Sequence, residues 1–167
     1  MTIEDGAALR APLTADIRRL AAGDRVRLSG ELLVVHPNAL AQLCETVGRR
    51  ESLPAPLDGA VLATLTPASA TGDGAMRPTN DLAHVGGTAQ LLAAGVRATI
   101  GVGPASLLLA YALRKYGGVH LVAPQPELFP ASIRHVGSFG DGVLGVVTVD
   151  QLDLVVANDS RGGVWRG

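Results

Sequence analysis

The side chains that could do chemistry gather in one stretch of the sequence, residues 67–103, and at its border. The first half is a polar connection, which offers hydroxyl, carboxylate, amide and guanidinium groups: Thr66, Ser69, Thr71, Asp73, Arg77, Thr79, Asn80 and Asp81. Long connections inside a compact domain are more often functional than idle. A solvated loop would have the same composition, so these residues indicate a site without specifying its reaction.

The second half of the stretch ends in a glycine turn, Gly101-Val102-Gly103-Pro104, between an expected strand and an expected helix. Glycines let a ligand approach the backbone, and free amides at a helix start attract anions. Fuller phosphate-binding patterns are missing, because Ser106 stands where a dinucleotide fingerprint has its third glycine and no Lys-Ser/Thr pair follows. A tight turn without a ligand is therefore the favoured interpretation, and a small-anion site is the alternative.

Histidine and cysteine offer little metal or nucleophile chemistry. His36, His84, His120 and His135 lack metal-motif spacing, and no Ser-His-Asp or Cys-His arrangement can be argued. We retain His36 as a site candidate, because it ends an expected strand just before a proline, where side chains project into clefts. His120 alternates within a strand and is expected to be structural. The lone Cys44 can form neither an internal disulfide nor a cysteine-ligated cluster, so no metal ligand is assigned.

The composition indicates one globular domain that spans residues 1–167. Hydrophobic residues make up 47% of the chain and charged residues 17%, which fits a compact α/β protein with a core of aliphatic side chains. A formal net charge of -1 gives no reason to expect nucleic acid or an anionic membrane surface. The amino terminus has neither a basic start nor an apolar run, and no apolar segment approaches the ~20 residues of a membrane span. We therefore expect a cytoplasmic protein.

Apolar runs and their punctuation by glycine and proline predict alternating strands and helices after an N-terminal arm, residues 1–12. Helices are expected at residues 15–22, 38–47, 82–94 and 105–115, and strands at 25–29, 32–35, 60–65, 96–100, 119–123, 133–136, 144–149 and 152–157. Strand pairs lie near both ends, with strand-helix-strand units between them. An α/β domain with a mixed sheet follows, or two small sheets plus helices.

Many of these segments carry short motifs whose order and spacing match one family. The matching residues are Leu13-Thr14, Asp16-Ile17-Arg18, Leu20, Gly23-Asp24, Leu28-Ser29-Gly30, Leu57-Asp58-Gly59-Ala60-Val61, Pro78-Thr79, Leu91-Leu92, Gly95-Val96, Ile100-Gly101, Gly103, Tyr116-Gly117-Gly118-Val119 and residues 156–162. Along nearly its whole length the chain resembles the β subunit, or carboxy-terminal domain, of class I iron-sulfur fumarases and L-tartrate dehydratases.

The resemblance implies an architecture and a partner. The fold would be a swivelling β/β/α-type domain with mixed sheets and flanking helices. It would close over a 4Fe-4S cluster that a separate α subunit holds, so this chain would bind no cofactor itself. The substrate would be a small carboxylate, on which this domain supplies the base and clamps the carboxylates. Neither a nucleic acid nor a membrane is an expected partner, and a homodimer stays open as an alternative.

The resemblance carries over only part of the family's site. Its loop reads Gly-Pro-Thr-Thr-Ser-x-Arg-Met-Asp, and the first threonine, the proposed base, corresponds to Thr79. The carboxylate-binding arginine corresponds to Ala83, and the lysine between the turn glycines corresponds to Val102. The arginine after the early strand pair corresponds to His36, and the aspartate that follows it to Pro37. Losing a charge-assisted contact to a buried anion typically costs several kcal/mol.

The leading hypothesis is therefore a divergent hydro-lyase β subunit that acts with an α partner on a less anionic hydroxy acid. Thr79 would transfer the proton, and the pocket would be lined by Ser29, His36, Arg77, Asn80, Gly101 and Gly103. The alternative is a catalytically degenerate domain that serves in binding or scaffolding. A stand-alone binder of a small anion at the glycine turn is a third reading.

Overall fold

The computed structural model describes residues 7–53, 55–67, 76–80, 82, 87–123, 134–139 and 142–166, which form a mixed α/β domain. The strands are β1 (Ala7–Ala11), β2 (Arg25–Val35), β3 (Val61–Pro67), β4 (Met76–Pro78), β5 (Ala98–Gly101), β6 (Val119–Val122), β7 (Arg134–Phe139) and β8 (Gly142–Asn158). The helices are α1 (Pro37–Gly48), α3 (Thr88–Ala93) and α4 (Leu107–Tyr116), with a 3-10 helix η1 (Ala15–Arg19).

The strands form one eight-stranded sheet that closes on itself as a five-stranded barrel. Around the barrel the order is β2, β3, β5, β6 and β8, and β8 pairs again with β2. The pairs β2–β3, β3–β5 and β5–β6 are parallel, whereas β8 runs antiparallel to both of its barrel neighbours. Strands β1, β4 and β7 extend the sheet outside the closed ring. The expected mixed sheet is confirmed as a single closed sheet.

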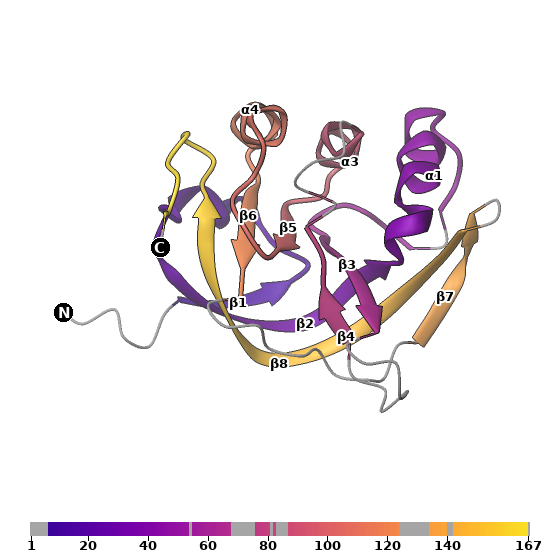
Figure 1. Ribbon diagram of the computed structural model, residues 1–167, viewed down its shortest axis with the longest axis horizontal. Coiled ribbons are helices and arrows are strands. Elements are labelled where there is room, and N and C mark those ends of the chain that lie inside the picture. The colour runs from indigo at the N-terminus through magenta and orange to yellow at the C-terminus, as the bar shows by residue number, and fades with distance from the viewer. Residues whose placement is uncertain are drawn as a thin grey trace.

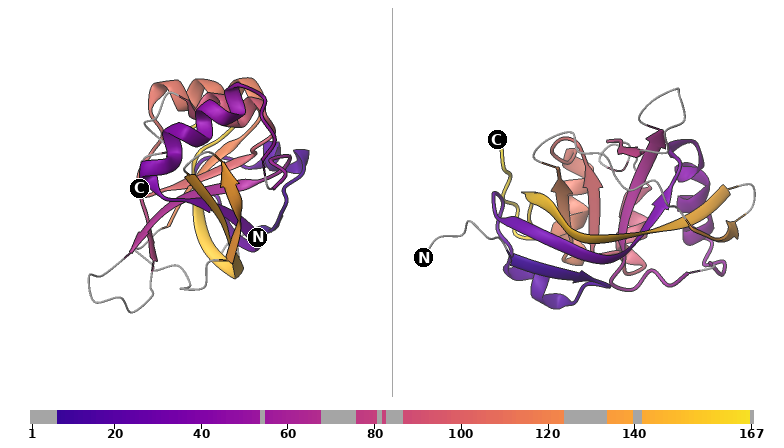
Figure 2. Two further views of the ribbon diagram at one scale, coloured as in Figure 1. Left: turned by 90° about the vertical axis from the view of Figure 1, so that its right-hand side faces the viewer. Right: turned by 90° about the horizontal axis from the view of Figure 1, so that it is seen from below.

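Helices α1, α3 and α4 lie together along one side of the barrel, as Figures 1 and 2 show. Helix α1 connects β2 to β3, α3 precedes β5, and α4 connects β5 to β6. Each is the crossover between two parallel strands, which is why all of them cover the same side. The carboxyl ends of β2, β3, β5 and β6 therefore meet at one edge of the sheet, the position where open α/β sheets bind ligands.

Two apolar cores hold this arrangement. The barrel interior is filled by aliphatic side chains, among them Leu28, Leu32, Ile100, Leu121 and Val156. A second core lies between the sheet and the helices, where alternate strand residues such as Leu33 and Leu62 pack against Leu43, Leu92 and Leu113. Both faces of the parallel strands are thus buried, which accounts for their continuous apolar runs.

Strands β2 and β8 are each longer than the sequence suggested. Two breaks were expected, at Ser29-Gly30 and between residues 149 and 152, but the structure has a register shift inside a continuous pair of strands. The Gln151 N–H donates to the Ser29 hydroxyl oxygen at 2.9 Å, which pins the shift. Gly30 has φ +112, and a Cβ there would lie 2.7 Å from the Ala11 carbonyl oxygen. The local irregularity is a β-bulge rather than a strand end.

Other elements also differ from expectation. The arm expected at residues 1–12 includes a strand, because Ala7–Ala11 pairs in parallel with β2. The helix expected at residues 15–22 is the short η1, and the polar connection contains β4, which pairs with the end of β3. Within the described parts of the chain, no helix combines the length and apolar composition needed to cross a membrane.

Candidate functional site

The candidate site lies at the carboxyl edge of the four parallel barrel strands. The strand register aligns Val35 with Thr64, Ala63 with Ile100, and Gly101 with Val122. The segments that follow these positions therefore emerge side by side. They are the start of α1, the connection that returns through β4, and the glycine turn after β5. The sequence's polar connection and its glycine turn, which α3 and β5 separate along the chain, meet here.

Asn80 holds the glycine turn. Its Oδ1 accepts from the Val102 N–H at 3.2 Å and from the Gly103 N–H at 3.3 Å. The backbone N–H of Ala105, which follows Pro104, donates to Asn158 Oδ1 at 2.8 Å. Three of the amides that were expected to attract a small anion, those of Val102, Gly103 and Ala105, therefore already donate to side chains. This geometry argues against the stand-alone anion site, and the turn functions as a fixed structural element.

His120, which is completely buried, also forms a hydrogen bond with the glycine turn. Its Nε2 donates to the Gly103 carbonyl oxygen at 2.9 Å, since a carbonyl can only accept. Its Nδ1 lies 2.7 Å from the hydroxyl of Thr99, which is also completely buried. The structural role expected for His120 fits this geometry, but nothing in the sequence tied it to the site. Only the parallel register of β5 and β6, which pairs Thr99 with His120, brings them together.

Gly101 is required by this packing. A Cβ on Gly101 would lie 2.5 Å from Asn80 Oδ1 and 2.9 Å from the His120 ring atoms Cε1 and Nε2. Gly103 is different, because a Cβ there would meet only Asn80 Nδ2, at 3.7 Å. The first glycine thus lets two side chains close on the turn, whereas the second has ordinary space around it.

Thr79 is paired with Thr64 on β3. The Thr79 N–H donates to the Thr64 carbonyl at 2.9 Å, and the two hydroxyl oxygens are 2.6 Å apart. Thr64 is completely buried and Thr79 half-buried, so the pair lies at the boundary between core and edge. When Thr64 donates, the hydrogen bond stabilises negative charge on the Thr79 oxygen, which is the direction a proton-transfer residue needs. Sequence reasoning missed Thr64.

The other candidate residues divide into two groups. Arg77 is exposed on β4 opposite Thr66, and His36 is exposed after β2, where its Nδ1 accepts from the Asn38 N–H at 3.1 Å as the cap of α1. Both belong to the carboxyl edge. Ser29 does not: it lies six residues before Val35, roughly 20 Å away along an extended strand. Its hydroxyl serves the bulge of β8 instead of the site.

A cavity of about 420 Å³ adjoins the glycine turn. Its walls are mostly apolar, with one aromatic and one cationic side chain: Val102, Gly103, Pro104, Val122, Ala123, Ala157, Trp165 and Arg166. Trp165 packs on Val122 and Ala157, and its backbone N–H donates to the Ala157 carbonyl at 2.7 Å. Arg166 therefore brings a cation to the edge from the end of the sequence, which the motif comparison did not anticipate.

Asp159 fixes the segment that carries Trp165. Burial alone would raise the pKa of Asp159, but the amides of Ala22, Gly163 and Arg161 and the charge of Arg161 hold it below its ordinary value. The amide donors lie at 2.9, 2.7 and 2.8 Å from its oxygens. The carboxylate is thereby ionised and fully engaged, so its role is to anchor the turn after β8.

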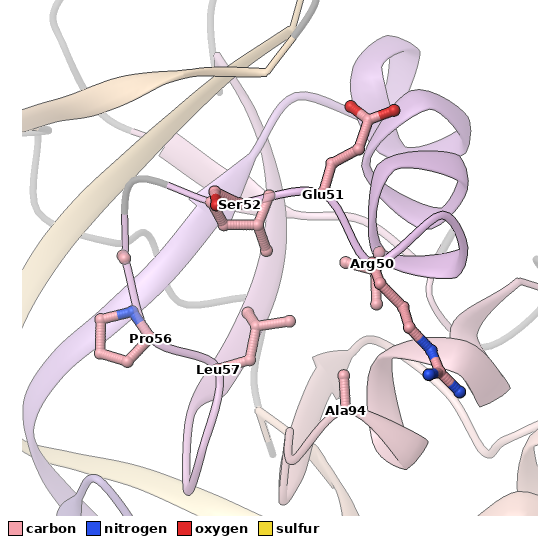
Figure 3. A pocket seen from close by; sticks show the side chains of 9 residues that line it. Arg50, Glu51, Ser52, Pro56, Leu57 and Ala94 are labelled. Atoms are coloured by element: carbon pink, nitrogen blue, oxygen red, sulfur yellow. The ribbon is translucent and has the colours of Figure 1, made fainter.

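A larger and more open depression, about 570 Å³, lies at the opposite edge, where α1 ends and β3 begins. Figure 3 shows the side chains of Arg50 and Glu51 pointing away from one another there. The rest of the lining is mainly aliphatic and includes Leu57 and Ala94. Without convergent polar groups, this depression offers less chemistry than the carboxyl edge.

The lone cysteine, Cys44, does not fit an iron-sulfur ligand. Cys44 is buried between α1 and the sheet, and burial raises the pKa of its thiol to about 11, so it stays protonated. Among the residues that the structure describes, no group of three or more His, Cys, Asp or Glu side chains could hold a metal ion.

Several residues named from the sequence lie outside the described residues. These are Ser69, Thr71, Asp73, Asp81, Ala83 and His84. A scan against models of protein families finds no match for this chain, and a search of the curated proteins finds none either.

Proposed function

We propose that the chain is the β subunit of a hydro-lyase of the fumarase and tartrate dehydratase type, which works with an iron-sulfur α subunit on a small hydroxy acid. The observation that supports this most is the meeting of Thr79, Asn80 and the glycine turn at the carboxyl edge of β3 and β5. The resemblance implied that these residues belong to one site. In this proposal the barrel and its helix layer act as the swivelling β/β/α domain.

The residues divide the work as follows. Thr79, hydrogen-bonded to Thr64, transfers the proton. Asn80 and His120 hold the glycine turn rigid, so that the edge keeps its shape when a substrate arrives. A cluster held by the α subunit would supply Lewis-acid chemistry for the departing hydroxyl, and Cys44 would have no part in it.

The lining favours a less anionic substrate than fumarate or tartrate. Val102 stands where the resemblance expects a lysine and is 57% exposed, and the neighbouring cavity has mostly apolar walls. Arg166 and Arg77 are the cations that the described part of this edge offers, and both are exposed. We therefore propose a hydroxy acid with one carboxylate and an apolar substituent, with that substituent against Val102 and Trp165.

Turnover by the complex tests this proposal. The chain would be co-expressed with an α-type subunit encoded beside it, purified without oxygen and assayed for hydration and elimination of mono- and dicarboxylic hydroxy acids. Thr79→Val should lower kcat by at least about 100-fold, and Thr79→Ser by much less, because proton transfer by a positioned group contributes about 10²–10⁴-fold. Thr148→Val, on an exposed position of β8, is the matched control. Failure to form a complex, or Thr79→Val turnover equal to that of the control, would remove the proposal.

The second candidate is a catalytically degenerate domain that binds or scaffolds. The exposed Val102 favours it, since this apolar residue stands where the resemblance expects a substrate-binding lysine. In that case, Thr79→Val should leave the growth of cells that depend on the protein unchanged, whereas changes on a partner-binding surface should impair it.

A further inference from the structure

The solvent-facing side of α4 carries large apolar side chains, whereas surface helices usually carry polar ones there. In the described part of the chain, the large hydrophobic side chains that stay exposed are Val102 at 57%, Leu107 at 90%, Leu108 at 70%, Tyr111 at 67% and Val164 at 38%. We call these five residues the α4 patch. The opposite face of the same helix is buried in the core through Leu109, Ala112 and Leu113.

The five residues belong to one surface. Leu107 and Leu108 are each three or four positions from Tyr111, so their side chains lie next to it on the outer face of the helix. Val102 lies in the turn that leads into α4. The segment after β8 runs beside the helix, since a Cβ on Gly162 would meet the Arg114 side chain at 3.4 Å. Figure 1 shows this segment next to α4.

The patch is as large as the apolar patches on monomeric proteins that often have a function. Its exposed surface is on the order of 500 Å², in the range of the largest patches on monomeric proteins, which are often functional. A standard protein interface buries about 800 Å² on each partner, so the patch could form the centre of one, with a polar border making up the rest.

The border of the patch is cationic. Arg114 and Lys115 continue the outer face of α4 toward its end and are exposed, as are Arg161 and Arg166 on the neighbouring segment. The carboxylate of this segment, Asp159, is buried and engaged with backbone amides. A complementary surface would therefore be apolar at its centre and carry carboxylates around it.

A second copy of the chain meets this requirement poorly. About a two-fold axis, a parallel pair of α4 helices would set Arg114 and Lys115 of one copy beside the same residues of the other, and an antiparallel pair would place them toward the start of the other's helix. That end carries the positive pole of the helix dipole, has no acidic residue in its first turn and lies near Arg166. Like charges opposite one another would weaken such a dimer.

We propose that the α4 patch docks a different protein, whose apolar surface is ringed by carboxylates and reaches the turn at Val102. This goes beyond the proposed function, because it requires neither catalysis nor a cluster. A protein can contact Leu107, Leu108 and Tyr111 while leaving the adjoining cavity open. An anionic lipid surface would also match apolar and cationic groups, but it would cover the cavity together with the patch.

Photocrosslinking followed by titration tests the docking. Tyr111 is replaced by p-benzoylphenylalanine in cells that naturally make the protein, and the same replacement at the exposed Ala93 of α3 is the control. The protein crosslinked only from position 111 is identified, purified and titrated against the intact chain. We expect Leu108→Glu, and separately the pair Arg114→Glu and Lys115→Glu, to weaken binding by at least about tenfold. Ala93→Glu should leave it within about twofold, and added salt should weaken the wild-type complex.

Each of the following results overturns the proposal. One is a crosslink between copies of the chain, with a concentration-dependent mass that Leu108→Glu abolishes. Another is co-flotation with vesicles of phosphatidylcholine and phosphatidylserine that the same variant abolishes. The absence of a crosslink specific to position 111 is a third. A purified partner that binds Leu108→Glu as tightly as wild type is the fourth. Because the readout is binding, none of these depends on whether Thr79 is catalytic.

Discussion

Gly101→Ala tests whether the glycine turn is held by the two side chains that close on it. The added Cβ would lie 2.5 Å from Asn80 Oδ1 and 2.9 Å from the His120 ring. Neither neighbour can move freely, because Asn80 accepts from two amides and His120 is hydrogen-bonded at both ring nitrogens. Backbone strain plays no part, since φ at this position is not positive. The variant therefore isolates the packing of the turn.

The magnitude follows from two contributions. Overpacking a well-filled site costs about 1–3 kcal/mol, and each hydrogen bond lost when Asn80 is pushed aside costs about 1 kcal/mol. We therefore expect Gly101→Ala to lower the free energy of unfolding by roughly 2–5 kcal/mol. Gly103→Ala is the matched control, because its Cβ would have 3.7 Å to Asn80 Nδ2. It should change stability by less than about 0.5 kcal/mol.

Urea unfolding of a double-mutant cycle provides the assay. Asn80→Ala alone should cost about 1–2 kcal/mol, because the Val102 and Gly103 amides lose their acceptor. In the Asn80→Ala background, Gly101→Ala should cost at least about 1 kcal/mol less than in wild type, since one of the two clashes is gone. Additivity of the two changes within about 0.5 kcal/mol would refute the reasoning, as would a Gly101→Ala variant as stable as Gly103→Ala.

Two further predictions concern titratable groups away from the turn. The pKa of Asp159 is lowered in the folded state, so its stabilisation is present above the unfolded value near 4 and is lost as pH falls through the lower folded value. The stability difference between wild type and Asp159→Asn, measured by urea unfolding, should therefore be constant above about pH 5 and shrink toward pH 2; a difference that persists unchanged contradicts a charge effect. Because the thiol pKa of Cys44 is about 11, iodoacetamide at pH 8 should modify it at least ~100-fold more slowly in the folded protein than in urea. Equal rates would show that Cys44 is accessible.

The segments that span the barrel could be predicted well because both of their faces are buried. β5 and β6 begin or end within two residues of the expected strands at 96–100 and 119–123. Helix α4, expected at residues 105–115, starts at Leu107, where the Ser106 hydroxyl accepts from the Leu109 N–H at 3.2 Å. In these segments, the local signals from glycine, proline and capping residues favour the same structure as the burial that the whole fold imposes.

The predicted ends of two strands were wrong, because hydrogen bonds between distant segments keep the strands continuous where glycine and polar residues suggested a break. Ser29-Gly30 and Asp150-Gln151 resemble strand ends, yet they face one another in the ladder of β2 and β8 and form a bulge. Part of the site was likewise missed. The resemblance pointed to Thr79 and Asn80, but nothing in the local sequence around Thr64 and Thr99 marks them as site residues. Their chemistry arises only from the register that places them beside Thr79 and His120.

The sequence by itself determined the alternation of buried strands and helices, because apolar periodicity and Gly/Pro punctuation are local properties. It also determined which residue types the polar connection and the glycine turn contain. Only the tertiary structure decided that β8 closes the sheet on β2, because pairing across more than 100 residues leaves no local trace. It also decided that the Gly101 turn is occupied by Asn80 and His120. The tertiary structure also decided which face of the apolar helix α4 stays exposed, since helical periodicity does not tell which face the rest of the fold will cover.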